Sequence, residues 1–310
     1  MPRTIRIAAA QMGAIQKNDT RADAVGRMVA LMRQAHDRGV NLIVFPELTL
    51  TTFFPRWSAD LSDVMERWFE REMPNQATAS LFECAQHYQM AMSFGYAELT
   101  PDGHRYNTSI LVDRSGAIVG KYRKIHLPGT REPVFGRDPQ QLEKRYFEVG
   151  DLGFRVWRFM NGIFGMCICN DRRWPEAYRV MGLQGVELIL LGYNTPTKNS
   201  FGLEETAASR MFQNHICMQA NAYQNSTWVI GVAKAGNEDG YELMAGTAII
   251  RPNGEIAAVA ATTGEELVVH DCDLDEAQIL KKTLFDFDKH RRIEHYGIIT
   301  SQVGVVPPPL

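Results

Sequence analysis

The chain has 310 residues, of which 45% are hydrophobic and 22% are charged. This composition is typical of a soluble globular protein with a sizeable core, and it excludes disordered and collagen-like chains. The formal charge of −3 leaves no basic excess for a phosphate backbone or an anionic lipid surface, so we expect neither nucleic acid nor a membrane as a partner.

The cysteines do not form the pattern of a cross-linked scaffold. Their number is odd, and no two of them form a C-x-x-C pair; they are Cys84, Cys167, Cys169, Cys217 and Cys272. This argues against a disulfide framework and a zinc ribbon, so we expect a reducing, cytoplasmic location. The N-terminal apolar run Ile7–Ala10 is too short for a signal peptide or a membrane-spanning helix.

Short apolar runs alternate with longer amphipathic segments along the chain. The runs predict strands at Thr4–Ala10, Asn41–Phe45, Met90–Ala97, Thr108–Asp113, Ile118–Tyr122, Gly165–Cys169, Glu187–Leu191, Thr227–Ala233, Thr247–Arg251, Glu255–Ala260 and Glu266–Asp271. The amphipathic segments predict helices at Thr20–Asp37, Ala77–His87, Pro175–Leu183, Glu204–Tyr223 and Asp273–Phe285. This alternation indicates an α/β fold, and turn signals at 113–116 and 252–254 add antiparallel pairs. No linker or repeat divides the chain, so we expect one domain over residues 1–310 with an extended tail at about 303–310.

Several common catalytic motifs are absent from the sequence. It contains no G-x-G-x-x-G, no G-x-x-x-x-G-K-[ST], no H-E-x-x-H and no G-x-S-x-G string. Dinucleotide-binding, P-loop, zinc-protease and serine-hydrolase sites are therefore excluded. The eight histidines are scattered along the chain, so we expect no metal and no cofactor.

Three chemically capable side chains follow predicted strands. Glu47 ends the run N-L-I-V-F-P-E, Lys124 lies in G-K-Y-R-K-I-H-L-P-G, and Cys169 closes G-M-C-I-C shortly before Pro175. Strand ends are where α/β sheets place their sites, and a strand-to-helix turn exposes a nucleophile. Taken singly, each has a plainer explanation: a solvated glutamate, a surface lysine and a buried cysteine. Strand alternation puts Cys167 on the same face as Cys169, with only Cys169 at the rim.

Three strings together resemble the nitrilase, or carbon–nitrogen hydrolase, superfamily. They are FPE at 45–47, YRKIHLPG at 122–129 and CNDRRWPE at 169–176, and their order and spacing are similar to those of its Glu-Lys-Cys triad. The resemblance implies a four-layer α-β-β-α sandwich that assembles into homodimers or homotetramers. It also implies that Glu47 is the general base, that Lys124 stabilises the tetrahedral intermediate and that Cys169 is the nucleophile. Glu143 would be a second carboxylate close to the triad.

Longer strings resemble one branch of that superfamily, the bacterial N-carbamoyl-D-amino acid amidohydrolases. They include NLIVFPELTLTTFFPRW, LEKRYFEVGDLGF and GYNTPT. The resemblance implies hydrolysis of N-carbamoyl-D-amino acids to the D-amino acid, CO2 and ammonia through a cysteine thioester. The substrate-binding residues that it implies are Asn170, Arg172, Arg173, Asn194, Thr195 and His126. The chain departs from that branch at Gln141 and Lys198, where the branch has histidines, and in the stretch 199–210.

The residue types suit this chemistry. A free thiol has a pKa near about 8.5 and is mostly protonated at pH 7, so a neighbouring base or cation must favour the thiolate. Lys124 suits an oxyanion, helped by the backbone N–H of Asn170. The guanidinium groups of Arg172 and Arg173 match a substrate carboxylate, and a salt bridge with Glu176 at the helix start is the alternative.

Other activities remain open from the sequence. A β-ureidopropionase, an N-carbamoylputrescine hydrolase or an aliphatic amidase would use the same triad. A cationic amine substrate would require carboxylates where this chain has Arg172 and Arg173. A remote alternative is an inactive binding or scaffold protein of the same fold.

Overall fold

Thirteen strands form one hydrogen-bonded sheet in the computed structural model, which describes residues 3–309. The sheet is folded into two halves, because β1 (Thr4–Gly13) and β10 (Trp228–Ala235) pair only through two residues near their ends. Besides β1, the first half contains β2 (Leu42–Val44), β3 (Phe69–Glu70), β4 (Ala91–Leu99), β5 (Arg105–Val112), β6 (Ile118–Arg123) and β15 (Glu266–Asp273). Besides β10, the second half contains β7 (Val156–Phe159), β8 (Gly162–Ile168), β9 (Leu188–Tyr193), β13 (Ala248–Ile250) and β14 (Ile256–Val259). A separate hairpin pairs β11 (Asn237–Glu238) with β12 (Tyr241–Glu242).

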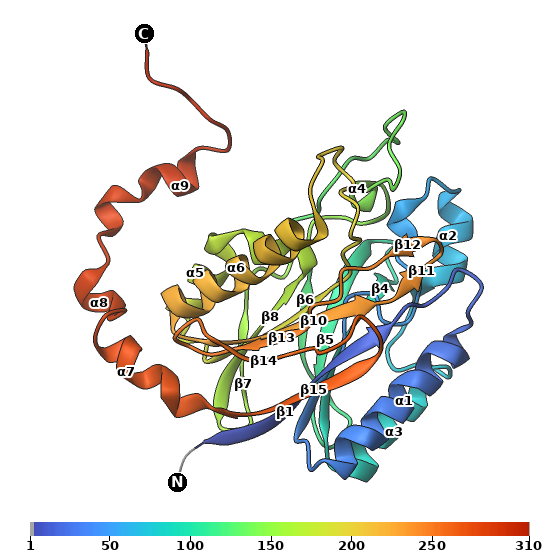
Figure 1. Ribbon diagram of the computed structural model, residues 1–310, viewed down its shortest axis with the longest axis horizontal. Helices are drawn as coiled ribbons and strands as arrows, with labels where there is room; N and C mark the ends of the chain where they lie inside the picture. The colour runs from blue at the N-terminus through green and yellow to red at the C-terminus, as the bar shows by residue number, and fades with distance from the viewer. Residues whose placement is uncertain (1–2, 310) are drawn as a thin grey trace.

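Helices cover the outer face of each half of the sheet. As Figure 1 shows, α1 (Arg21–Asp37) and α3 (Ala79–Tyr88) lie on one side, and α5 (Pro175–Leu183) and α6 (Ala207–Asn225) lie on the other. One buried cluster joins α1 and α3 to the first half, and a second cluster joins the two halves to each other and to α5 and α6. The expected α/β fold with four layers, α-β-β-α, is therefore confirmed.

The predicted helices and strands are found with shifted ends. The predicted helix Glu204–Tyr223 begins only at Ala207, because the Thr206 side chain accepts a hydrogen bond from the Ser209 N–H and caps it. The predicted helix Asp273–Phe285 is wrong in its type and its end. The segment is a 3₁₀ turn followed by α7 (Ala277–Lys282), and the helix ends there because Thr283 has a non-helical backbone. The prediction missed α2 (Leu61–Trp68), α4 (Glu143–Tyr146), α8 (Phe287–His290), α9 (Gly297–Ser301) and the strands β3, β7, β11 and β12.

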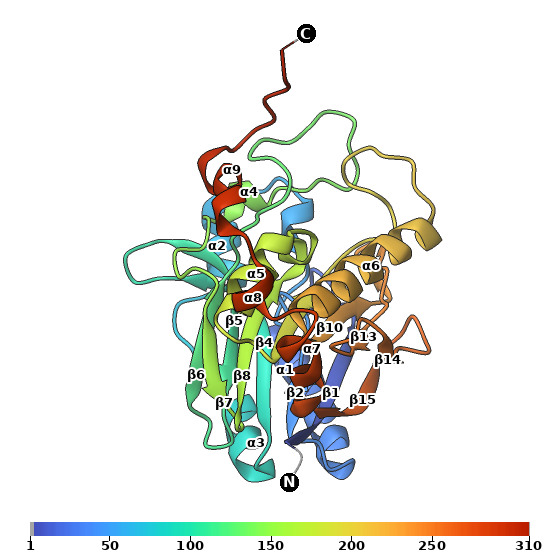
Figure 2. The ribbon, with the colours of Figure 1, turned by 90° about the vertical axis from the view of Figure 1, so that its left-hand side faces the viewer.

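The C-terminal segment after β15 runs along the outside of the molecule. It carries α7, α8 and α9 and curves away from the layers, and its final described residues form neither helix nor strand (Figures 1 and 2). The predicted tail is therefore extended up to Pro309, and Leu310 lies outside the described residues. Within residues 3–309, no helix is long and apolar enough to cross a bilayer. The expected homo-oligomer and the cytoplasmic location stay predictions.

Strands from both halves of the sheet end at the same edge of the sandwich. β2, β4 and β6 run in one direction in the first half, and β8 and β9 run parallel to each other in the second. The segments that follow β2, β6, β8 and β9 begin with residues 45, 124, 169 and 194. This edge therefore gathers the side chains that the sequence singles out.

Candidate active site

Glu47 lies in a turn between the two halves of the sheet. Glycines of both halves make room for it, because a Cβ on Gly192 would lie 2.6 Å from the Glu47 nitrogen and one on Gly95 would lie 3.0 Å from its Cα. The carboxylate is buried. Its Oε1 accepts hydrogen bonds from Asn107 Nδ2 at 2.8 Å and Lys124 Nζ at 2.7 Å. Among residues 3–309, its Oε2 accepts only the Asn194 N–H, at 3.1 Å, so a lone pair remains there for a further proton.

Lys124 is the fully buried cation of the site. Its Nζ donates to Glu47 at 2.7 Å and to Glu143 Oε2 at 2.6 Å. Burial alone would lower the pKa of Lys124, but the negative charges of Cys169 as a thiolate, Glu143 and Glu47 raise it above its usual value. The side chain is therefore an ammonium at neutral pH, and it bridges the two carboxylates.

Glu143 begins α4 and is the second carboxylate that accepts a hydrogen bond from Lys124. Its Oε1 accepts from Gln141 Nε2 at 2.9 Å, so the neutral Gln141 holds this carboxyl. Burial and the like charge of Glu47 raise the pKa of Glu143 to about 7, although Lys124 acts in the opposite direction. Two carboxyl groups this close to each other do not both ionise easily. Because its pKa is raised, Glu143 is the one that takes up a proton.

Cys169 forms the turn that follows β8. The strand ends at Ile168, and Cys169 has φ 47°, a left-handed conformation that is uncommon for a residue with a Cβ. The expectation that strand alternation places Cys167 and Cys169 on one face is therefore wrong, because the strand does not continue through Cys169. Cys167 stays within β8 and is buried, whereas Cys169 keeps 6% of its surface exposed.

The Cys169 thiol lies within the field of the buried charges. Burial and the Glu47 charge raise the pKa of Cys169, and Lys124 and Arg172 only partly oppose this. The resting group is therefore a neutral thiol at pH 7, and attack requires a base rather than a preformed thiolate. Among the carboxylates near the thiol, Glu47 has the largest effect on the pKa of Cys169.

This protonation state can be measured. Because the pKa of Cys169 is raised, its thiolate should be absent at pH 7 and should form only above the pH of about 8.5 at which an ordinary thiol titrates. The measurement is the thiolate ultraviolet absorbance of the wild type minus that of Cys169→Ala across a pH titration. A full thiolate signal at pH 7 would contradict the neutral resting thiol.

The two arginines differ in their surroundings. Arg172 is buried; its Nη1 donates to the Cys169 carbonyl at 2.7 Å and lies 3.7 Å from Sγ, and its Nη2 donates to Thr195 Oγ1 at 3.1 Å. Arg173 is exposed at the side-chain surface and donates to Asn170 Oδ1 at 3.2 Å. In the described residues neither forms a salt bridge, and the alternative pairing with Glu176 is not formed.

The remaining predicted substrate residues are held by protein partners. The Asn194 side chain accepts a hydrogen bond from Arg56 at 2.8 Å and donates one to Glu238 at 3.1 Å. Its backbone N–H donates to Glu47. The Asn170 side chain donates to the His126 carbonyl at 3.0 Å. The His126 ring bonds to Asp171 and stacks on Trp174, with ring centroids 5.0 Å apart. These contacts indicate that Asn194 and His126 hold other residues of the site, namely Glu47 and Asp171.

Sequence reasoning missed a buried ion cluster behind Asn194. Glu238 accepts from Arg56 Nη1 at 2.7 Å and from Lys234 Nζ at 3.1 Å, and all three side chains are buried. Asn107, which holds Glu47, was also missed, although it immediately precedes the predicted strand Thr108–Asp113. Lys234 and Glu238 are close in the chain, but Arg56 and Asn107 reach their partners Glu238 and Glu47 only through the fold, so no local pattern identifies these two.

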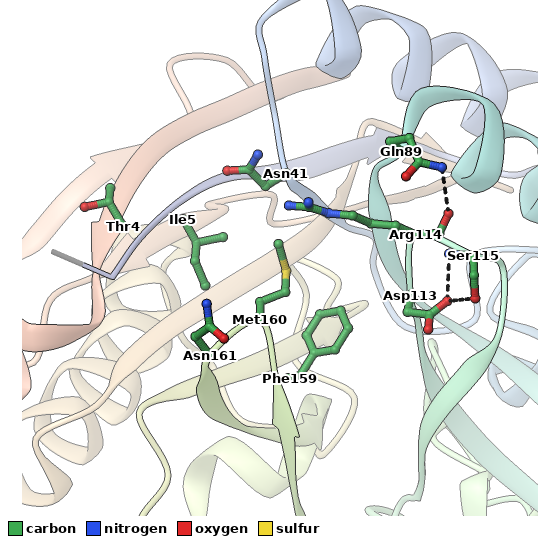
Figure 3. Close-up of a pocket in the computed structure, with 10 residues that line it drawn as sticks. All are labelled: Thr4, Ile5, Asn41, Gln89, Asp113, Arg114, Ser115, Phe159, Met160 and Asn161. Carbon is green, nitrogen blue, oxygen red and sulfur yellow. Dashed lines mark hydrogen bonds between the residues drawn. The ribbon is translucent and has the colours of Figure 1, made fainter. Parts of the chain in front are cut away.

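Two cavities differ in their relation to this centre. One of about 540 Å³ is lined by residues such as Thr4, Asn41, Arg114 and Met160 (Figure 3). It includes no predicted site residue, so it is not the reaction centre. Another, of about 680 Å³, opens beside the Cys169 turn and is lined by Asn170, His126 and Trp174. Its other lining residues include three cations and one carboxylate, namely Arg105, Arg131, Lys144 and Glu148.

The model of the carbon–nitrogen hydrolase family matches residues 6–282 of this chain. The chain belongs to the carbon–nitrogen hydrolase family. It is 26% identical over 321 aligned residues to an N-carbamoylputrescine amidase of Solanum lycopersicum, with 98% of each chain covered. It is 28% identical to a citrullinase of Francisella tularensis, with 91% of this chain and 94% of that protein covered.

A solved structure has the same fold. A carbon–nitrogen hydrolase from Helicobacter pylori superposes with a TM-score of 0.81 at 24% identity, with 96% of this chain and 99% of that chain covered. This carbon–nitrogen hydrolase is therefore a nitrilase-superfamily enzyme, an amidohydrolase that acts on C–N bonds. The named relatives differ from one another in their substrates.

Proposed function

We propose that this enzyme hydrolyses N-carbamoyl-D-amino acids to the D-amino acid, CO2 and ammonia. The observation that carries the proposal is the arginine pair beside the thiol: Arg172 and Arg173 have no carboxylate partner among residues 3–309, and Arg172 reaches within 3.7 Å of Cys169 Sγ. A buried guanidinium without a counter-charge is costly, and a substrate carboxylate would supply the charge that is missing. The preference for the D form rests on the resemblance of the sequence strings.

The side chains provide for both halves of the reaction. Cys169 Sγ attacks the carbamoyl carbon while Glu47 takes the thiol proton, and Lys124 donates to the oxygen that becomes negative. The bond to the terminal nitrogen then breaks, and Glu47 returns the proton so that ammonia leaves and a thioester remains on Cys169.

The second half restores the enzyme. A water molecule attacks the thioester while Glu47 accepts its proton, the C–S bond breaks, and the proton passes to the departing sulfur. The product is a carbamate of the amino acid, which loses CO2 to give the free amino acid. Glu143, with its raised pKa, holds Lys124 through both halves.

The named relatives favour a second candidate, hydrolysis of N-carbamoylputrescine or another ureido compound such as citrulline. N-carbamoylputrescine carries an ammonium group and no carboxylate. Arg172, which lies 3.7 Å from Cys169 Sγ without a carboxylate partner among residues 3–309, would repel that ammonium group.

Ammonia release separates the candidates. Purified enzyme is offered N-carbamoyl-D- and L-amino acids, N-carbamoyl-β-alanine, N-carbamoylputrescine, citrulline and simple amides. We expect the highest kcat/KM for N-carbamoyl-D-amino acids. A higher value for N-carbamoylputrescine would replace the proposal with the second candidate, and release from none of these ureido compounds would refute both.

Arg173→Ala tests the carboxylate anchor. A charge-assisted bidentate contact is worth about 1.5–3 kcal/mol, so kcat/KM for the acid substrate should fall roughly 10- to 150-fold. A neutral amide should lose far less. Arg173 is the better position for this test than Arg172, because Arg172 also holds the Cys169 carbonyl.

Arg173→Lys is the matched variant. Lysine keeps the charge but not the planar fork, so it should restore only part of the activity on the acid substrate. An equal loss on acid and neutral substrates would show that Arg173 supports the Cys169 turn instead, and would remove the main support for an acidic substrate.

A further inference from the structure

Asp171 lies two residues after Cys169 and receives four hydrogen bonds on one buried carboxylate. Oδ2 accepts from the Ile168 N–H at 3.0 Å and from Tyr122 Oη at 2.7 Å. Oδ1 accepts from the His126 N–H at 3.0 Å and from His126 Nδ1 at 2.8 Å. The side chain is fully buried, and none of the salt bridges of residues 3–309 joins it to a lysine or an arginine.

These donors come from both sides of the reaction centre. Ile168 immediately precedes the nucleophile Cys169. Tyr122 and His126 flank Lys124, two residues to either side. One carboxylate therefore connects the turn that presents the thiol to the segment that presents the ammonium.

The backbone around Cys169 requires such a connection. Its φ of 47° costs energy for a residue with a side chain, and a conformation of this kind persists only where surrounding contacts hold it. Within the turn, the Asp171 carbonyl accepts from the Trp174 N–H and Arg172 holds the Cys169 carbonyl, and neither contact reaches the Lys124 segment. The Asn170 side chain adds one bond to that segment, at the His126 carbonyl, whereas the Asp171 carboxylate accepts three from it.

We propose that Asp171 is a positioning residue that fixes the Cys169 thiol relative to Lys124. The inference rests on the proposed roles of Cys169 and Lys124 in catalysis. The oxygen of the tetrahedral intermediate must lie within reach of Lys124 while its carbon is bonded to Sγ, so this spacing matters in the transition state more than in substrate binding. Loss of the connection should therefore lower kcat and leave KM nearly unchanged.

Asp171→Asn keeps the size of the side chain but presents an NH2 group where a carboxylate oxygen accepts two donors. Displacing a reacting group by about 1 Å can cost about 100-fold in rate, so kcat should fall about 100-fold with KM within about threefold of the wild type. Tyr122→Phe removes one donor and should lower kcat about tenfold. In the Asp171→Asn background it should add much less than tenfold, because both variants weaken the same connection.

Glu187→Gln is the matched control for lost stability. Glu187 precedes β9 at the opposite edge, is buried, and accepts hydrogen bonds from Arg3, Gln278 and the Ile163 N–H. It should lower the thermal midpoint to a similar degree as Asp171→Asn and leave kcat within about twofold.

Alkylation of Cys169 by iodoacetamide gives a reading that does not depend on the natural substrate. At pH 7 the rate should fall about tenfold in Asp171→Asn and stay unchanged in Glu187→Gln. The inference is overturned if kcat and alkylation in Asp171→Asn match the control, or if KM rises while kcat holds. Absence of hydrolysis by the wild type would refute the proposed function alone, and the alkylation rates would then decide the role of Asp171.

Discussion

Cys169→Ala should lower the rate of ammonia release by about 10⁴-fold or more. The variant removes the one thiol that lies among Glu47, Lys124 and Arg172, and loss of a nucleophile in a covalent mechanism has effects of this size. The side chain is small and its backbone contacts are kept, so the variant should stay folded. The measurement is kcat with the best substrate, alongside the thermal midpoint.

Cys167→Ala is the matched control within the same strand. Cys167 is buried inside β8, and the change should cost about 1 kcal/mol of stability while kcat stays within about twofold. Near-native activity of Cys169→Ala would show that the nucleophile is another group. A large loss in Cys167→Ala alone would move the assignment to that cysteine.

Glu47→Gln should lower kcat by roughly 10²- to 10⁴-fold, the range of general acid–base catalysis. The amide keeps the shape of the side chain, and Lys124 remains paired with Glu143, so no buried cation is left alone. What is lost is the oxygen that accepts the thiol proton and later the proton of water. Because the Cys169 thiol is neutral at rest, its own ionisation does not compensate at pH 7.

Glu70→Gln provides the comparison for Glu47. Glu70 is also buried and paired, with Arg21, but it lies on β3 outside the site. It should lower stability with little change in kcat. If Glu47→Gln and Glu70→Gln have the same small effect on kcat, Glu47 is a structural group and the base must be sought elsewhere.

The strands of this fold can be predicted from the sequence because most of them are buried apolar runs of regular length. β4, for example, is buried at every position, and its apolar residues can be recognised from the local sequence alone. β7 was missed because it has only four residues, with the exposed Arg158 in its middle. α2 did carry a signal, since Asp60 caps it and Val64 and Trp68 face inward one turn apart.

The positions of Glu47, Lys124 and Cys169 at strand ends could also be predicted, but the residues that hold these side chains in place could not. Asn107 and Asp171 act through contacts between segments that the sequence does not show to be neighbours. The left-handed backbone of Cys169 was missed as well, because no glycine or asparagine marks it. Such features depend on how the two halves of the sheet meet.

The most direct test of the account is the mass of the enzyme during turnover. Wild-type enzyme is mixed with an excess of an N-carbamoyl-D-amino acid, quenched in acid within a single turnover, and examined intact and after digestion. The account predicts a transient adduct with the mass of the substrate less ammonia, located on the peptide that contains Cys169 and absent from Cys169→Ala. Turnover with Cys169 unmodified at every quench time, or an adduct on another residue, would contradict it.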